Sequence, residues 1–141
     1  MIRETLATFT TVEKTQSDIA ALIETRAFFI AERSGQLAGF ATYGPFRTGP
    51  GYAATAEHSV IVAAPFHGTG VGRALMTAVE AHAVTDKIHT LVGAVSSANP
   101  GAIAFHEALG YRVAGRLTDA GRKADQWLDL VLMQKILAAP D

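Results

Sequence analysis

The chain of 141 residues contains no cysteine, and its 12 basic residues are almost balanced by 13 acidic ones. The absence of cysteine excludes a disulfide framework, a thiolate metal site and a cysteine nucleophile. A formal net charge of -1 leaves no basic excess for neutralising phosphates, which argues against a nucleic-acid-binding protein. We also expect no metal ion, because the sequence shows no spaced cluster of carboxylates and histidines.

Long apolar segments are missing as well. No run approaches the roughly 20 apolar residues that span a bilayer, and the opening residues, Met-Ile-Arg-Glu-Thr, lack the apolar core of a signal peptide. We therefore expect no membrane association and a cytoplasmic location. Apolar residues at 49% and charged residues at 18% are typical of a compact globular protein, so we expect residues 1–141 to form one domain.

Strand-like and helix-like segments alternate along the chain. The hydrophobic pattern predicts strands over 27–31, 37–43, 55–62, 88–95, 111–116 and 127–135, and helices over 18–23, 71–84 and 100–109. In the longest helix one apolar stripe is formed by Val71, Leu75, Val79 and Ala83. Two consecutive strands close the chain, which predicts a mixed α/β (α+β) domain rather than a doubly wound fold.

A glycine-rich loop connects the third predicted strand to the longest helix. Glycines at positions 68, 70 and 72 let the backbone bend sharply and approach a ligand closely. The helix that follows offers N–H groups without an intrahelical acceptor and the positive end of its dipole, and Arg73 adds a positive charge. The pattern predicts a phosphate or pyrophosphate site, although such a loop can also be only a tight connection.

Two nucleotide-binding patterns do not fit this loop. The spacing of its glycines is one residue too short for the dinucleotide-binding fingerprint, and no acidic residue follows at the end of the next strand. No Lys-Ser or Lys-Thr pair follows the last glycine, as a triphosphate-binding loop requires. The predicted ligand is therefore a phosphate compound of another class.

Two neighbouring segments together resemble the acetyl-CoA motif of the Gcn5-related N-acetyltransferase (GNAT) superfamily. They are Glu57-His-Ser-Val-Ile-Val62 and His67-Gly-Thr-Gly-Val-Gly-Arg73. Three others resemble its phosphinothricin acetyltransferase branch: Gly44-Pro-Phe-Arg47, Asn99-Pro-Gly-Ala-Ile-Ala-Phe-His-Glu-Ala-Leu-Gly-Tyr111 and Gly121-Arg-Lys-Ala-Asp-Gln-Trp-Leu-Asp129. The likeness extends from about residue 6 to residue 135. It implies a twisted, mostly antiparallel sheet flanked by helices, with splayed central strands.

The resemblance implies acetyl-CoA as the acetyl donor. In this family the strand before the glycine loop pairs with the pantetheine arm through its backbone, and the loop holds the pyrophosphate. The implied cofactor-binding residues are Val60, Ile61, Val62, His67, Gly68, Thr69, Gly70, Val71, Gly72, Arg73 and Asn99. Asn99 precedes Pro100 and can equally serve as a helix cap.

The resemblance also implies two catalytic residues. Glu57 matches the general base of the branch, and His106 matches a histidine near the thioester sulfur. The chemistry requires such groups, because an ammonium must lose a proton before its nitrogen attacks a thioester. A histidine near neutral pH can protonate the departing thiolate. Glu57 can instead be a solvated residue of the strand edge, and His106 can simply pack within its helix.

The implied acceptor is the primary amine of a small amino acid or analogue, such as phosphinothricin or the sulfone or sulfoximine of methionine. The candidate substrate-binding residues are Phe46, Arg47, Tyr52, Ser59 and Trp127. Arg47 and Tyr52 are candidates for holding a substrate carboxylate, whereas Trp127 can also be a core aromatic. We interpret His58 as a structural or surface residue. Acetylation of another amine, such as a protein N-terminus, and a non-catalytic acetyl-CoA-binding module remain alternative functions.

The sequence departs from the family pattern in places. His67 replaces a usual arginine or glutamine, Arg122 stands where an aromatic or apolar residue is frequent, and Ala102 replaces a frequent serine. Relatives usually begin with a strand and a helix ahead of a segment that resembles Thr5-Leu-Ala-Thr-Phe9, and we expect this chain to start after them. A homodimer that covers the resulting apolar surface, or a truncated or misassigned start, would explain this difference.

Overall fold

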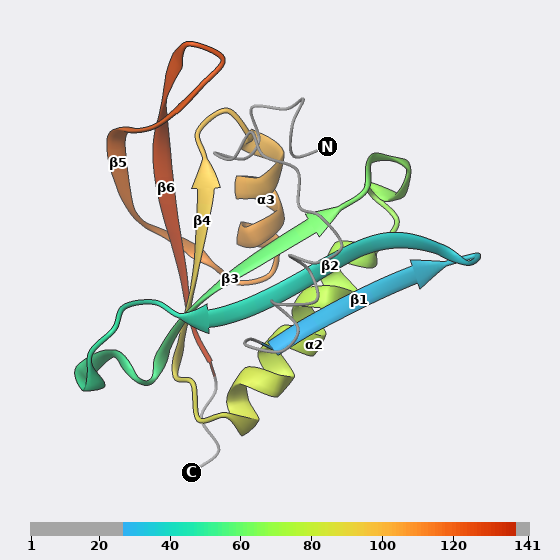
Figure 1. The fold of residues 1–141 in the computed structure, drawn as a ribbon, viewed down its shortest axis with the longest axis horizontal. Coiled ribbons are helices and arrows are strands. Elements are labelled where there is room, and N and C mark those ends of the chain that lie inside the picture. Colours follow the sequence, from blue (N-terminus) through green and yellow to red (C-terminus); the bar gives the residue numbers. More distant parts are fainter. Residues whose placement is uncertain (1–26, 138–141) are drawn as a thin grey trace.

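The computed structural model describes residues 27–137, which form six strands and two α-helices (Figure 1). The strands are β1 (Ala27–Arg33), β2 (Gln36–Pro45), β3 (Thr55–Val62), β4 (Thr90–Ser96), β5 (Arg112–Lys123) and β6 (Gln126–Ile136). The α-helices are α2 (Val71–Thr85) and α3 (Pro100–Ala108), and two 3-10 turns lie at Pro50–Tyr52 and Ala64–Phe66. The helix predicted over 18–23 lies outside the described residues.

The strands form one sheet in the order β1-β2-β3-β4-β6-β5. Every neighbouring pair is antiparallel except β3 and β4, which are parallel. A parallel pair needs a crossover connection, and here α2 provides it. The predicted mixed, mostly antiparallel sheet flanked by helices is confirmed.

The two parallel strands separate part of the way along their length. Their pairing ends at His58 opposite Gly93, although β3 continues to Val62 and β4 to Ser96. Beyond this point β3 stays bonded to β2, and β4 stays bonded to β6. Figure 1 shows the two strands diverging, with α3 drawn in the angle between them. We call this opening the fork; it confirms the predicted splay of the central strands.

Helix α2 covers β1, β2 and β3 with the apolar stripe predicted from the sequence. Val71, Leu75, Val79 and Ala83 are each at most 4% exposed. Burying such side chains contributes about 1.5–3 kcal/mol each for the larger ones. The helix begins after Gly70, whose φ of 89° is in the left-handed region.

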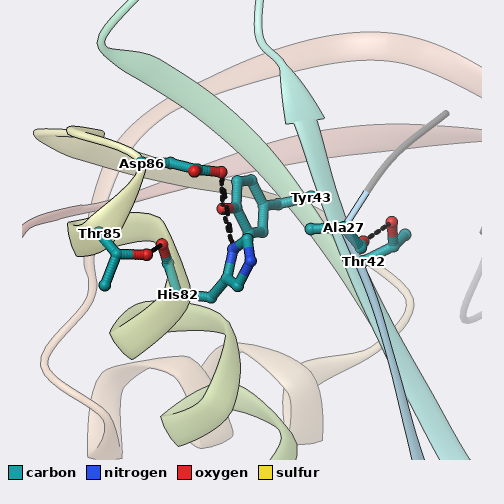
Figure 2. Close-up of polar contacts among 6 residues, drawn as sticks. All are labelled: Ala27, Thr42, Tyr43, His82, Thr85 and Asp86. Carbon is teal, nitrogen blue, oxygen red and sulfur yellow. Dashed lines mark hydrogen bonds and ion pairs between the residues drawn. The ribbon is translucent and has the colours of Figure 1, made fainter.

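Polar contacts fasten the C-terminal end of α2 to β2 (Figure 2). The Tyr43 hydroxyl donates to Asp86 Oδ2 at 2.6 Å, so its oxygen accepts from His82 Nδ1, also at 2.6 Å. Burial, together with the bond to Asp86, raises the pKa of Tyr43 above its ordinary value. The same strand is tied to β1 where the Thr42 hydroxyl donates to the Ala27 carbonyl. These contacts fix α2, and hence the glycine loop before it, relative to the sheet.

The boundaries of some elements differ from those predicted. Strand β2 includes Gly44 and Pro45, which were expected in a loop, and β4 begins at Thr90 rather than at 88. Strand β5 extends to Lys123 rather than ending at 116. It passes an irregularity after Leu117, where the Asp129 carboxylate accepts from the Arg116 Nε and from the Asp119 backbone N–H. A side chain from the partner strand thus supports the bulge and lets pairing resume. Neither helix within residues 27–137 is long and apolar enough to cross a membrane.

Candidate active site

The glycine loop lies at the wide end of the fork, between the end of β3 and the start of α2. Gly68 and Gly70 have φ values of 74° and 89°, a conformation that side-chain-bearing residues rarely adopt. A Cβ atom built on either glycine would meet no other described atom within 4 Å. None of the described side chains caps α2, so its first N–H groups face this open space. The loop therefore offers backbone donors to an anion.

Two other loop residues are partly engaged within the protein. The Nε2 of His67 donates to the Val62 carbonyl at 2.8 Å, and the Thr69 hydroxyl donates to the Phe66 carbonyl at 2.5 Å. Arg73, in the first turn of α2, is exposed. The cation at this end of the fork is thus Arg73, whereas the ring of His67 is turned to the end of β3.

The edge of β3 that faces the fork carries backbone positions that are not paired with β4, although the Val62 carbonyl accepts from His67. The Ala63 N–H bonds to Ala38 O, and the Phe46 N–H bonds to Thr55 O. In an antiparallel ladder the bonded pairs alternate, so Ile61 turns its N–H and C=O toward β2. Val60 and Val62 turn theirs toward the fork, where β4 has already diverged. Ile61 can therefore line the fork only with its side chain.

Glu57 and His58 are adjacent on β3 and point to opposite faces of the sheet. His58 faces α2 and α3, while half-buried Glu57 and exposed Ser59 project from the other face. Glu57 lies opposite Val92 on β4, one step before the pairing ends. Its carboxylate thus projects beside the narrow end of the fork.

On the helix-covered face, this narrow end is occupied by two imidazole rings. The Nε2 atoms of His58 and His106 are 2.9 Å apart, and the Nδ1 of His106 lies 2.8 Å from the Ala102 carbonyl. The residues are 3% and 5% exposed. Burial, aided by the neighbouring His106, lowers the pKa of His58 to about 3, and burial lowers the pKa of His106. Both rings are therefore neutral near pH 7.

Gly93 makes room for this pair of rings. A Cβ atom at this position would lie 3.0 Å from two atoms of His58 and 3.1 Å from Nε2 of His106. Neither the role of Gly93 nor the contact of His58 with His106 was predicted from the sequence. The contacting histidines are 48 residues apart, so no local pattern signals their meeting.

Asn99 acts as the N-cap of α3. Its Oδ1 accepts from the Ala102 N–H at 3.0 Å, and Pro100 occupies the first turn. The capping interpretation offered by the sequence is thus confirmed. The turn lies at the end of β4, on the side of the fork opposite the glycine loop.

The predicted substrate-binding residues do not form one group. Arg47 and Tyr52 line a hollow of about 500 Å³ together with Tyr43 and Asp86, and the Arg47 guanidinium lies 5.7 Å from the centre of the Tyr52 ring. Neither Glu57 nor Ser59 lines this hollow. Phe46 is half-buried and directly precedes Arg47 in the chain, but it does not line the hollow.

Trp127 lies apart from the other candidate substrate residues, near the turn between β5 and β6. It is 58% exposed, and Arg122 packs on its ring at 4.8 Å. The core interpretation of Trp127 is therefore wrong. An arginine at position 122 is explained by this stacking on an exposed aromatic ring.

The fork, the glycine loop at its wide end and the helices on one face define a class of protein. The sequence profile of the acetyltransferase (GNAT) family matches residues 1–111, and the chain belongs to this family.

Two curated relatives are named as acetyltransferases of amino-acid analogues. The chain is 36% identical over 104 residues to an L-methionine sulfoximine/L-methionine sulfone acetyltransferase of Pseudomonas aeruginosa, covering 74% of this chain and 60% of the relative. It is 36% identical over 115 residues to a phosphinothricin N-acetyltransferase of Alcaligenes faecalis, covering 81% and 58%. The chain thus spans about 60% of the length of such relatives.

A solved structure shares the fold closely. A putative acetyltransferase from Salmonella typhimurium, solved with its cofactor acetyl-CoA, superposes with a TM-score of 0.90 at 30% identity. The match covers 99% of this chain and 86% of that one.

Proposed function

We propose that this protein transfers the acetyl group of acetyl-CoA to the primary amine of a small amino acid or amino-acid analogue. The observation that carries the proposal is the fork between β3 and β4, open from His58 to Val62 and bordered by the glycine loop. The curated relatives support the acceptor class, because their names include methionine sulfoximine, methionine sulfone and phosphinothricin.

The residues at the wide end fit a coenzyme A molecule. The space above Gly68 and Gly70, which a Cβ atom would fill, lets a diphosphate approach the N–H groups of Val71, Gly72 and Arg73. Val60, through its N–H and C=O, and Val62, through its N–H, present backbone groups that match the amides of a pantetheine arm. Acetyl-CoA supplies an acetyl group activated as a thioester. We assign Asn99 a supporting role from the β4 side, through its amide nitrogen, because its oxygen caps α3.

Glu57, at the narrow end, fits the proton transfer that the reaction requires. Glu57 is proposed to accept a proton from the substrate ammonium, directly or through a water, on the sheet face opposite the helices. The amine nitrogen then forms a bond to the acetyl carbon and the C–S bond breaks. The second proton that the nitrogen loses passes, directly or through a water, to the departing thiolate. His106, on the other side of the fork, was the predicted donor of that proton, but both of its ring nitrogens are engaged, Nδ1 with Ala102 O and Nε2 with His58. We propose instead that its neutral ring borders the thioester and fixes the position of the sulfur.

The substrate-binding roles rest on position and charge. Arg47 and Tyr52 are proposed to bind the substrate carboxylate from the loop between β2 and β3, with Phe46 and Ser59 along the path toward Glu57. Trp127 is proposed to line the acceptor site from its position at the end of the β5–β6 hairpin. We also propose that the active protein is a homodimer, because Val113 and Leu117 on β5 are each 50% exposed and a second subunit would cover them. A cytoplasmic location is proposed as well. Size-exclusion chromatography with light scattering measures the molar mass and so distinguishes a dimer from a monomer.

An assay with acetyl-CoA and a panel of amines tests the function. The panel contains methionine sulfoximine, methionine sulfone, phosphinothricin, ordinary amino acids and a peptide with a free N-terminus, and release of free thiol is measured. We expect release with the first three. Release with the peptide alone would support acetylation of protein N-termini. Tight binding of coenzyme A without release for any amine would show a non-catalytic binding module instead.

A further inference from the structure

His58 is the residue of the narrow end to which neither the sequence nor the proposed reaction gives a role. It occupies the last rung of the β3–β4 pairing, and its partner across the rung is Gly93, the residue without a side chain. The ring of His58 fills that space and meets the ring of His106 through their Nε2 atoms, with the planes 21° apart and the centroids 5.1 Å apart. Strand β3 thereby contacts α3 where the fork begins.

The hydrogen-bond partners of the two rings fix where their protons lie. A carbonyl oxygen only accepts, so the bond to Ala102 O requires a proton on Nδ1 of His106. A neutral His106 then has a lone pair on Nε2, and the proton in the contact between the two Nε2 atoms belongs to His58. The Nδ1 of His58 consequently carries a lone pair, and it has no hydrogen-bond partner among the described residues.

The surroundings hold the pair firmly. The Tyr111 ring meets the rings of His58 and His106 edge-on, both at 5.3 Å between centroids. Its hydroxyl donates to Glu80, which also accepts from the Lys135 ammonium at 2.7 Å. These charged groups therefore contact Tyr111 and not the imidazoles. Among the described residues, His58 supplies the hydrogen bond that Nε2 of His106 receives.

We propose that His58 is a positioning residue, whose Nε2–H donates to Nε2 of His106 and clamps that ring from the strand side while Ala102 clamps it from the helix side. An imidazole held at both nitrogens keeps one tautomer and one orientation beside the fork. This role rests on the proposed function, because it matters for catalysis only if a thioester lies in the fork. The hydrogen bond itself can be measured without any substrate.

The first experiment detects the bond by nuclear magnetic resonance in protein with 15N-labelled histidine. A scalar coupling between the two Nε2 nuclei is expected at pH 7, together with a protonated Nδ1 on His106. In His58→Phe the coupling must vanish, and in Gly93→Ala it should weaken, because the added methyl displaces both rings. A wild-type protein with a protonated Nε2 on His106, or without the coupling, would overturn the proposal even if the enzyme is active.

The second experiment compares two substitutions in the acetylation assay. His58→Phe keeps a ring but removes the donor, whereas His58→Gln keeps an N–H that can reach His106. We expect His58→Phe to lower kcat about tenfold or more, because a displaced ring misplaces the groups beside it, and to leave the KM for acetyl-CoA nearly unchanged. We expect His58→Gln to retain most of the wild-type kcat. Equal losses in both variants, at equal stability, would show a packing role and refute the positioning role. If His58→Phe does not fold, the wild-type coupling and the kcat of His58→Gln still decide.

Discussion

The two ends of the fork are built in different ways. The wide end consists of exposed backbone, with left-handed glycines and the start of α2, and its contacts require no particular side chain beyond Arg73. The narrow end consists of buried side chains, with two imidazoles in contact beside Gly93, where a Cβ atom would lie 3.0–3.1 Å from both rings. Backbone donors suit the binding of a constant coenzyme, whereas fixed side chains suit proton transfer. Substitutions at the wide end should therefore change the binding of the coenzyme. Substitutions at the narrow end should change turnover and stability.

The largest effect is expected for Glu57→Gln, which keeps the shape of the side chain and removes its basicity. We expect kcat to fall about a hundredfold, within the range for a lost general base, while the dissociation constant of acetyl-CoA stays nearly the same. Steady-state kinetics and calorimetry measure the two quantities. The matched control is Glu107→Gln on the exposed face of α3, which should leave both unchanged. An unaltered kcat in Glu57→Gln would remove this carboxylate from the mechanism.

Gly93→Ala tests how tightly the narrow end is packed. The new methyl would stand 3.0–3.1 Å from both imidazoles, and neither buried ring can move freely, so we expect a loss of about 1–3 kcal/mol in the free energy of unfolding. Urea denaturation at pH 7 measures it. Gly115→Ala on β5, where a Cβ would meet no described atom within 4 Å, should change stability by less than about 0.5 kcal/mol. Similar stabilities of the two variants would contradict the close packing.

The two ends also differ in how far the sequence predicts them. The glycine loop, the stripe of α2 and the start of α3 follow from residues that are close in sequence, and their local geometry agrees with the predicted elements. The contact of His58 with His106 depends on the parallel pairing and on the place of α3, which no local pattern contains. The exposure of Trp127 was likewise missed, because an aromatic residue in a strand reads the same on either face. The contact of the two histidines and the exposure of Trp127 both depend on packing between segments that are far apart in the sequence.

The pH dependence of stability separates the narrow end from the rest of the molecule. His58 has an ordinary pKa of 6.5 when unfolded and about 3 when folded, so between these values the unfolded chain binds a proton that the folded chain does not. The free energy of unfolding should therefore be at its full value above pH 6.5 and should decrease as the pH is lowered below it. Between pH 7.5 and 5, wild type should lose about 1–2 kcal/mol more than His58→Phe. Equal losses by urea denaturation would mean that the buried ring is protonated in the folded protein.

The smallest effect is expected at the wide end, for Gly70→Ala. Its φ of 89° disfavours a side chain, although space is available, so the free energy of unfolding should fall by about 1 kcal/mol. Gly35→Ala, in the β1–β2 turn, meets similar strain at a φ of 77° and similarly open space. Both variants should lose comparable stability, but only Gly70→Ala should raise the KM for acetyl-CoA, because it shifts the N–H groups that face the diphosphate. Its kcat at saturating acetyl-CoA should remain that of the wild type. A higher KM in both variants, or in neither, would mean that the left-handed bend at Gly70 is only a connection between β3 and α2, and that the coenzyme is held elsewhere.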